Sequence, residues 1–201
     1  MAKGVVKVGI GIVIVIVIAV AGAGAYYFGR IAPLIKSGKK EANYADKSRP
    51  DVSAFGYDTG KGAQKIKDLN GKVIVMDVWA TWCGPCIRSM PDVVALRNKY
   101  TGQPVEVIGL NVDSNGWNDV KPFLQRHREV DYTMAVPSPA PSFLLQSIVD
   151  LKPLGDVSAI PTIFVIDQQG KLAAKFVESD TLQQVDDLVA RLLNEESSAK
   201  K

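Results

Sequence analysis

The chain has 201 residues, which is enough for one ordinary domain with an appendage. Its net charge of +3 is unevenly placed, because the first 50 residues carry eight Lys or Arg against two Asp or Glu, while the rest is slightly acidic. The folded part therefore lacks the basic, aromatic-interleaved face of a nucleic-acid-binding protein, and we predict no nucleic-acid partner. The two cysteines are too few for a disulfide framework.

Residues 8–28 form an uninterrupted run without charged side chains. As a helix this run would be about 30 Å long, which matches the hydrocarbon thickness of a bilayer. Lysines precede it, and aromatic residues followed by Arg30 close it, as is typical of membrane interfaces. We therefore predict that residues 1–28 are a retained transmembrane helix. The alternative is a cleavable signal peptide with small-residue cleavage sites within residues 21–25.

Both interpretations place the rest of the chain outside the cytoplasm. More Lys and Arg follow the apolar run than precede it, which opposes export by the positive-inside rule, but this rule weakens for long translocated domains. We predict a single-pass protein of the inner (cytoplasmic) membrane whose folded domain faces the periplasm or the cell exterior. Residues 29–51 are predicted to be a linker, which is polar and charged from Ser37 onward.

The folded domain is predicted over residues 52–194, and residues 195–201 are predicted to be a disordered tail. Apolar β-branched runs bounded by turn residues predict strands, and apolar residues at helical spacing predict helices. In chain order we expect a strand at Val52–Tyr57, a strand at Val73–Trp79, a helix from Cys83 or Gly84 to about Tyr100 that Pro91 kinks, a strand at Val105–Asn111, a helix at Trp117–Arg128, a strand at Asp131–Val136, an extended loop at Pro137–Pro141, a short helix at Ser142–Asp150, hairpin strands at Thr162–Ile166 and Leu172–Val177, and a helix at Thr181–Asn194. This order predicts an α/β fold with a central mixed sheet flanked by helices.

Both cysteines stand in the sequence Trp82-Cys83-Gly84-Pro85-Cys86, where a predicted strand ends and a helix begins. A cysteine at a helix N-terminus meets unpaired backbone N–H groups and the positive end of the helix dipole, which favour thiolate over thiol. Cys86 would lie one turn inside the helix, close enough for a disulfide with Cys83. Pro85 suits the first helical turn, because its missing N–H would have no partner there. Gly84 leaves the outer side of the first sulfur uncrowded.

The stretch Val78–Cys86, which reads Val-Trp-Ala-Thr-Trp-Cys-Gly-Pro-Cys, resembles the active site of thioredoxin-fold proteins. Residues 52–193 as a whole are similar to the TlpA-like family, the membrane-anchored, extracytoplasmic thioredoxin-like reductases of bacteria. Further matches are Met90-Pro91, Leu110-Asn111-Val112-Asp113 and Ala159-Ile160-Pro161-Thr162. The resemblance implies a thioredoxin-like fold.

The resemblance also implies a role for several residues. Cys83 corresponds to the attacking cysteine and Cys86 to the resolving cysteine. Pro161 corresponds to the cis-proline opposite the disulfide, which leaves the backbone of Ile160 free to pair with an extended substrate. Asp77 corresponds to the buried acid that exchanges a proton with the resolving cysteine. Its apolar neighbours along the chain support this assignment. Burying a carboxylate among apolar residues costs free energy, so an acid at such a position is expected to have a function.

Trp82, Gly84 and Pro85, together with Ile160, are the residues predicted to contact the substrate. Trp82 and Trp79 are expected to frame the site. We expect their rings to cover the core and to form a shallow apolar docking surface.

The sequence departs from the family pattern at several positions. Gly109 stands where thioredoxins have a lysine that accompanies the buried acid, and many TlpA-like proteins have a neutral amide in place of Asp77. Ser89 occupies a position that is a glutamate in some TlpA-like proteins. The stretch from Pro137 to Pro153 is longer than usual. These departures bear on two parts of the resemblance: the details of the proton relay and the identity of the natural partner.

The predicted activity is thiol–disulfide exchange by the Cys83–Cys86 pair, without a cofactor or a metal. The Gly-Pro dipeptide between the cysteines matches reducing thioredoxins. We therefore predict a reductant of disulfides in exported proteins, and the family resemblance implies clients such as apocytochrome c. In an oxidising compartment such a reductant needs an electron source, for which the resemblance suggests a membrane thiol-electron donor.

Three alternatives belong to other classes. A zinc site would need four ligands, and His127 is the single histidine available beside the cysteine pair. A copper-delivery module would need soft ligands suitably placed, typically including a histidine. A peroxidase of related fold would need a cysteine in a different local sequence.

Overall fold

The computed structural model describes residues 42–43, 49–140, 142–145, 148–177 and 182–199. The predicted transmembrane segment and most of the predicted linker lie outside these residues. Within the described ranges, none of the helices combines the length and the apolarity that crossing a bilayer requires.

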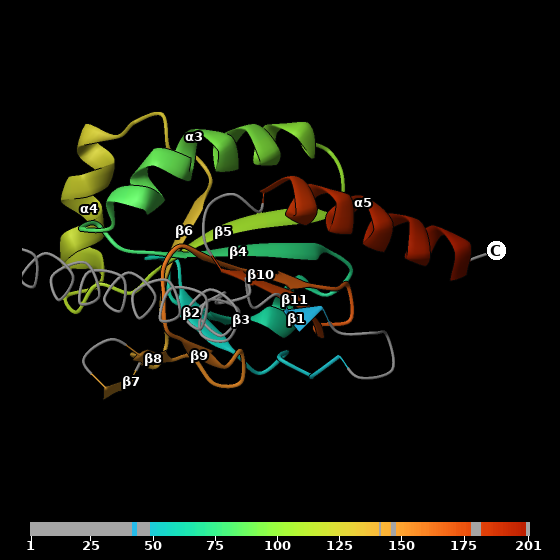
Figure 1. Cartoon of the computed structure of the whole chain (residues 1–201), viewed down its shortest axis with the longest axis horizontal. Helices are drawn as coiled ribbons and strands as arrows, with labels where there is room; N and C mark the ends of the chain where they lie inside the picture. The colour runs from blue at the N-terminus through green and yellow to red at the C-terminus, as the bar shows by residue number, and fades with distance from the viewer. Residues whose placement is uncertain (1–41, 44–48, 141, 146–147, 178–181, 200–201) are drawn as a thin grey trace, which may run out of the picture. The chain divides into compact units, whose positions relative to one another are not determined.

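The central element is an eight-stranded mixed sheet (Figure 1). In spatial order its strands are β1 (Ala42–Asn43), β11 (Leu172–Val177), β10 (Thr162–Ile166), β4 (Val73–Trp79), β5 (Val105–Asn111), β6 (Thr133–Pro137), β2 (Gly56–Asp58) and β3 (Ala63–Lys65). β4 and β5 are parallel, as are β5 and β6, whereas β10 is antiparallel to both β4 and β11. The predicted mixed sheet is confirmed, and four strands, β4, β5, β10 and β11, have the predicted bounds.

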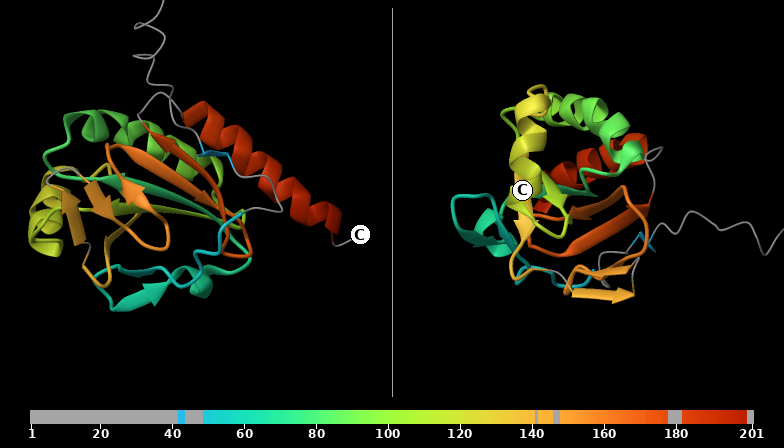
Figure 2. Two further views of the ribbon diagram at one scale, coloured as in Figure 1. Left: turned by 60° about the horizontal axis from the view of Figure 1, so that its bottom comes forward. Right: turned by 90° about the vertical axis from the view of Figure 1, so that its left-hand side faces the viewer.

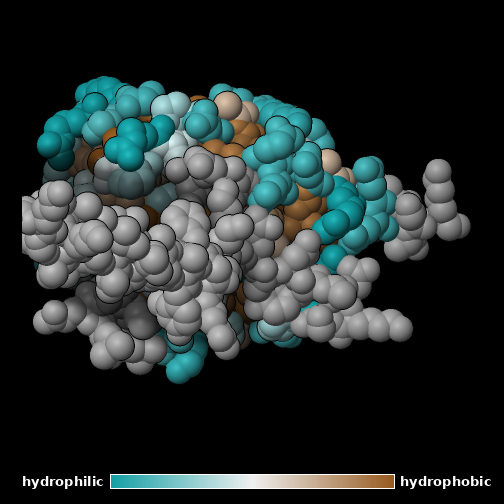
Figure 3. All heavy atoms as spheres, in the orientation of Figure 1, coloured by the Kyte–Doolittle hydropathy of each residue, from teal (hydrophilic) through white to brown (hydrophobic). Residues whose placement is uncertain are grey.

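The central strand β4 is buried at every position, which explains why all of its residues except Asp77 are apolar. The helix α3 (Gly84–Lys99) makes the crossover to β5 and continues through Pro91, and α4 (Trp117–Arg126) makes the next crossover to β6. Figure 2 shows α3 and α5 (Leu182–Ala199) together on one face of the sheet. In Figure 3 the outer surfaces of these helices are hydrophilic, and hydrophobic side chains show between them. Because successive side chains of β4 point to opposite faces and all are buried, the core extends over both faces of the sheet, and this helical layer covers one of them.

The short helix predicted at Ser142–Asp150 is wrong. A separate sheet of three strands stands there, made of β7 (Ser142–Leu145), β8 (Ile148–Asp150) and β9 (Asp156–Val157). It lies on the side of the central sheet away from α3 and α5 (Figures 1 and 2). A helix of this length is marginal by itself, whereas β8 gains antiparallel partners on both sides.

Two predictions at the start of the domain need correction. Residues 52–55 are not a strand; β2 begins at Gly56 and forms a hairpin with β3, followed by the 3₁₀ helix η3 (Ile66–Leu69). Within the predicted linker, β1 pairs with β11, and the buried Arg49 side chain lies 3.1 Å from the Asp167 carboxylate. The folded domain therefore begins before the predicted boundary at residue 52.

The predicted C-terminal helix is also too short. The helix α5 continues to Ala199 instead of ending at Asn194. Residues 195–199 therefore belong to the helix rather than to a disordered tail.

Candidate functional site

The two cysteines lie at the junction of β4 and α3, as predicted, and they form a disulfide. Cys83 is the N-cap of α3, and its Sγ accepts a hydrogen bond from the backbone N–H of Cys86 at 3.2 Å. Pro85 lies in the first helical turn, where no intrahelical partner for its nitrogen is needed. The helix N-terminus thus directs an N–H group at the first sulfur, which stabilises negative charge there.

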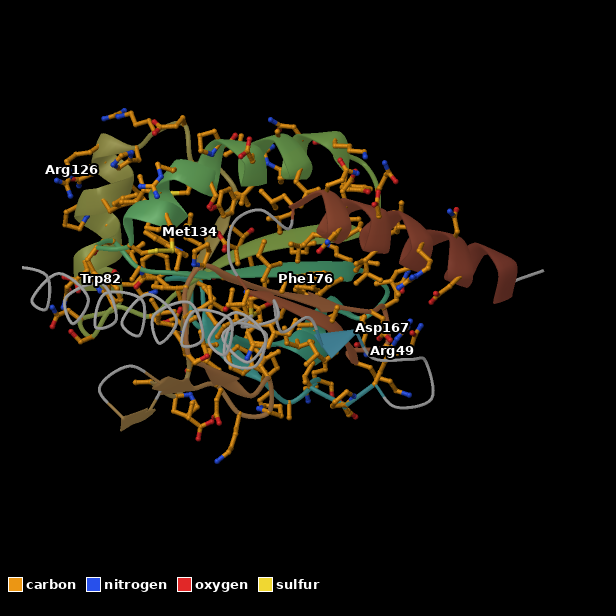
Figure 4. All side chains as sticks on the ribbon, in the orientation of Figure 1. Arg49, Trp82, Arg126, Met134, Asp167 and Phe176 are labelled. Atoms are coloured by element: carbon orange, nitrogen blue, oxygen red, sulfur yellow. A yellow bond between two sulfur atoms is a disulfide. The ribbon has the colours of Figure 1, made fainter. Side chains whose placement is uncertain are left out.

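Of the predicted site residues around the disulfide, some are exposed and others are buried. Trp82 is 72% exposed, and Gly84 and Pro85 beside it are exposed as well. Cys83 is only 4% exposed, and Cys86 is fully buried. Trp82 lies at one end of the domain, far from the Arg49–Asp167 pair at the other (Figure 4).

The two tryptophans that were expected to frame the site lie in different environments. Trp79 is completely buried and packs against Phe123 with 4.9 Å between ring centroids. It belongs to the core, so Trp82 alone of the two presents its ring to solvent.

The segment before β10 lies against the disulfide. The Ile160–Pro161 peptide bond is cis, as the resemblance implied. The Sγ of Cys83 is 3.8 Å from the carbonyl oxygen of Ile160. Among the described residues, neither the amide nor the carbonyl of Ile160 takes part in a backbone–backbone hydrogen bond.

The carboxyl group of Asp77 lies inside the domain, in the middle of β4. The residue is 1% exposed, and neither carboxylate oxygen has a hydrogen-bond partner within the described part of the chain. Burial disfavours the charged form and raises the pKa of Asp77 to about 7. A carboxyl group with this pKa can gain or lose a proton near neutral pH.

Gly109 pairs in register with Asp77 across the β4–β5 ladder. A Cβ atom at position 109 would lie 2.6 Å from the Met134 sulfur and 2.9 Å from a ring carbon of Tyr132. These two side chains occupy the space in which a longer residue beside Asp77 would have to stand. Met134 is buried near the end of the domain that carries Trp82 (Figure 4). The sequence showed the missing lysine but not the side chains that fill its place.

Ser89 is buried on α3, and its hydroxyl donates to the Cys86 carbonyl oxygen at 3.0 Å. This position therefore carries a local helix contact to the residue that holds the second sulfur.

Asp113 is a buried acid near the site that the sequence matched to the family without a role. It is 7% exposed, and its Oδ2 accepts hydrogen bonds from the backbone N–H of Thr81 and from the side-chain amide of Asn111. Its only sequence signal is a polar pair, Asn111 and Asp113, at the end of an apolar strand.

The alternative metal sites find no support in the geometry. Within the described residues, no three His, Cys, Asp or Glu side chains gather as metal ligands would. His127 stacks on Phe123 with 4.1 Å between ring centroids and its Nδ1 lies 3.1 Å from the Glu129 carboxylate.

Comparison with known proteins gives consistent matches. The family model described as Redoxin matches residues 44–192. The thiol-disulfide oxidoreductase ResA of Bacillus cereus is 29% identical over 130 residues, which cover 64% of this chain and 68% of that protein. ResA of Geobacillus thermodenitrificans is 31% identical over 108 residues, covering 54% of this chain and 56% of that protein.

Solved structures agree with this. A protein described as the thiol:disulfide interchange protein DsbE of Chlorobium tepidum has a TM-score of 0.57 and 28% identity, with 71% of this chain and 96% of that chain covered. A DsbF homologue from Corynebacterium diphtheriae has a TM-score of 0.60 at 24% identity, with 78% of this chain and 96% of that chain covered, and it supports the fold alone.

Proposed function

The chain belongs to the Redoxin family and is a thiol-disulfide oxidoreductase of thioredoxin fold, and we propose that it reduces disulfides in exported proteins such as apocytochrome c. The observation that carries this proposal is the position of Cys83. Its sulfur caps a helix N-terminus, lies beside the Ile160–Pro161 segment, and is bonded to Cys86. A sulfur in these surroundings is a good nucleophile when reduced and a reachable electrophile when oxidised.

The reaction follows from this arrangement. In the reduced protein, the Cys83 thiolate attacks one sulfur of the client disulfide, forming a mixed disulfide and releasing the other client sulfur as a thiolate. Cys86 then attacks Cys83, so that the client leaves as a dithiol and the Cys83–Cys86 disulfide remains. Two electrons have passed to the client. The two sulfurs are the only redox groups that this exchange needs.

Asp77 is the proposed proton acceptor for the second step. Cys86 must lose its proton before it attacks, and a buried carboxylate with a pKa near 7 can take that proton inside the domain. Because Gly109 leaves no lysine beside it, Asp77 does this without a neighbouring ammonium group.

The client is proposed to bind across the exposed residues of the motif. Trp82 supplies an apolar surface, Gly84 and Pro85 leave it open, and the backbone of Ile160 is available to pair with an extended client segment. Main-chain pairing would accept many sequences, as a reductant of several clients requires.

Returning the protein to its dithiol form needs an electron source, and we assign this role to a thiol-electron donor in the membrane. This fits a single-pass protein of the inner membrane whose domain faces the periplasm or the cell exterior. The Gly-Pro dipeptide predicts a reduction potential nearer to about −270 mV, as in thioredoxin, than to about −120 mV, as in DsbA.

The test is trapping with Cys86→Ala, in which the mixed disulfide cannot be resolved. We expect the wild-type domain to reduce insulin disulfides, and Cys86→Ala to retain exported proteins through a bond that dithiothreitol releases. Cys83→Ala is the matched control and should retain none. If Cys86→Ala captures no more protein than Cys83→Ala, the exchange role is wrong. Peroxide consumption that outpaces insulin reduction would instead indicate the peroxidase alternative.

A further inference from the structure

The short loop between β4 and Cys83 carries both the reactive sulfur and the exposed Trp82 ring. The backbone N–H of Cys83 donates to the Ala80 carbonyl oxygen at 3.0 Å, which closes the turn. A second contact fixes the turn to the rest of the domain, and it comes from Asp113.

The Asp113 carboxylate joins the end of β5 to this loop. Its Oδ2 accepts from the backbone N–H of Thr81 at 2.9 Å and from the Asn111 side-chain amide at 2.8 Å. The backbone N–H of Asp113 in turn donates to the Asn111 side-chain oxygen at 3.0 Å. One oxygen thus links two segments that are 32 residues apart in the chain.

Burial makes this link strong. Asn111 is 1% exposed and Asp113 is 7% exposed, so water competes poorly for either side chain. Removing the Asp113 side chain would leave the buried Asn111 amide and the half-buried Thr81 amide without their acceptor, and a donor shielded from water is costly to leave unpaired.

The hydrogen bond between Thr81 and Asp113 lies close enough to Cys83 in the chain to affect where the Cys83 sulfur is placed. Thr81 immediately precedes Trp82 and stands two residues before Cys83. A shift at Thr81 therefore moves the sulfur relative to the N–H groups at the start of α3. A misplacement of about 1 Å at a reacting group can cost roughly 100-fold in rate.

We propose that Asp113 is a positioning residue for dithiol exchange, holding the Thr81–Cys83 loop so that the Cys83 sulfur meets the N-terminus of α3. It acts through the loop and does not touch the reacting sulfur. This role builds on the proposed function, because it concerns the same sulfur.

The experiment compares Asp113→Ala with Asp113→Asn in the complete chain. The Asn side-chain oxygen can replace Oδ2 as an acceptor for both donors, whereas Ala supplies none. We expect Asp113→Ala to lower kcat/KM for insulin reduction roughly 10- to 100-fold, and Asp113→Asn to remain within about threefold of the wild type. Asp92→Ala, which removes an exposed acid from α3, is the control and should change nothing.

A readout independent of any client separates positioning from folding. In reduced protein, the pKa of Cys83 is measured by thiolate absorbance, and its reactivity by the rate of alkylation with iodoacetamide. Asp113→Ala should raise the pKa of Cys83 and slow alkylation near neutral pH, while Asp113→Asn should restore both. An unchanged Cys83 pKa in folded Asp113→Ala protein would overturn the proposal.

Two further outcomes are interpretable. If Asp113→Ala does not fold, Asn111→Ala removes one of the two donors and should shift the pKa of Cys83 in the same direction by less; no shift would overturn the proposal. If wild-type protein fails to reduce insulin, the proposed function is wrong, but the alkylation and pKa measurements still decide the role of Asp113.

Discussion

Asp77 of β4 lies directly across the sheet from Gly109 of β5, and the side chain that Gly109 lacks would collide with Met134 and Tyr132. The buried acid therefore has a neighbour that offers no charge and no hydrogen bond. Its surroundings are apolar enough to hold its pKa near 7. This pair distinguishes the site from one in which a lysine accompanies the acid.

The first prediction concerns the space beside Gly109. Gly109→Ala should lower the free energy of unfolding by about 1–3 kcal/mol, because an added methyl group overpacks this part of the core. The loss should be smaller when Met134→Ala is also present, since that change removes the sulfur nearest the new Cβ. Urea unfolding of the two single variants and the double variant measures this. Additive losses would show that Met134 is not the cause.

The second prediction concerns the pH dependence of stability. Below pH 4, Asp77 is protonated in both the folded and unfolded states, so its raised pKa does not lower the free energy of unfolding. Between pH 4 and 7 the unfolded chain loses this proton while the folded chain keeps it, and the free energy of unfolding falls. The shift in pKa from 3.8 to about 7 corresponds to as much as about 4 kcal/mol.

Asp77→Asn removes this titration. The stability difference between Asp77→Asn and wild type should therefore grow in favour of the variant from pH 4 to pH 8. Urea unfolding of the oxidised proteins at pH 4, 6 and 8 tests this, with the exposed Asp92→Asn as the control. A difference that stays constant with pH would contradict the raised pKa of Asp77.

The third prediction separates the two chemical steps. In the wild type, the rate at which Cys86 resolves the mixed disulfide should rise with pH as Asp77 ionises around pH 7. Asp77→Asn should slow this step by roughly 100-fold, the usual contribution of a general base. The attack by Cys83 should keep its rate. Rapid-quench measurement of the mixed disulfide with a disulfide peptide follows both steps, and an unaltered second step would remove Asp77 from the mechanism.

The fourth prediction contrasts the two tryptophans. Trp82→Ala should leave the free energy of unfolding within about 0.5 kcal/mol of the wild type, because the ring is 72% exposed, yet raise KM for protein clients. Trp79→Ala should cost about 3–5 kcal/mol, because that ring is fully buried. Thermal unfolding and insulin-reduction kinetics give the two readouts. Equal KM values for Trp82→Ala and wild type would exclude Trp82 from client binding.

The fifth prediction tests where the domain begins. Arg49 and Asp167 form a buried ion pair, so Arg49→Ala leaves a buried carboxylate without its charged partner and should cost about 3 kcal/mol. Glu195→Ala removes the more exposed partner of Arg49 and should cost less than about 1 kcal/mol. A chain beginning at residue 52 should be destabilised at least as much as Arg49→Ala. Equal stability of that shortened chain and the full domain would restore the boundary predicted from sequence.

The sequence predicted the elements whose signal is local. β4 and β5 are mainly apolar runs rich in β-branched residues, and α3 begins directly after a cysteine that is followed by Gly-Pro, so the ends of these elements can be predicted from the residues themselves. The strands β7 and β8 were mistaken for a helix because short apolar stretches fit both periods, and only the pairing with β9 decides between them.

The residues of the candidate site also divide into those that a local sequence signal predicts and those that depend on contacts distant in the chain. The positions of Cys83, Cys86 and Pro161 follow from short motifs. The contacts of Gly109 and Asp113 could not be predicted, because Met134, Tyr132 and Thr81 reach them from elements distant in the chain. The inclusion of Arg49 in the domain is likewise a long-range effect, since its partner Asp167 is 118 residues away.

The near-complete enclosure of Cys83, of which 4% is exposed, has a consequence for the choice of client. We expect an extended, unfolded client segment to bring its disulfide to the Cys83 sulfur more readily than a rigid part of a folded protein does. The clients proposed above would then be reduced most readily before they have finished folding, and the same burial would limit contact of the sulfur with oxidants.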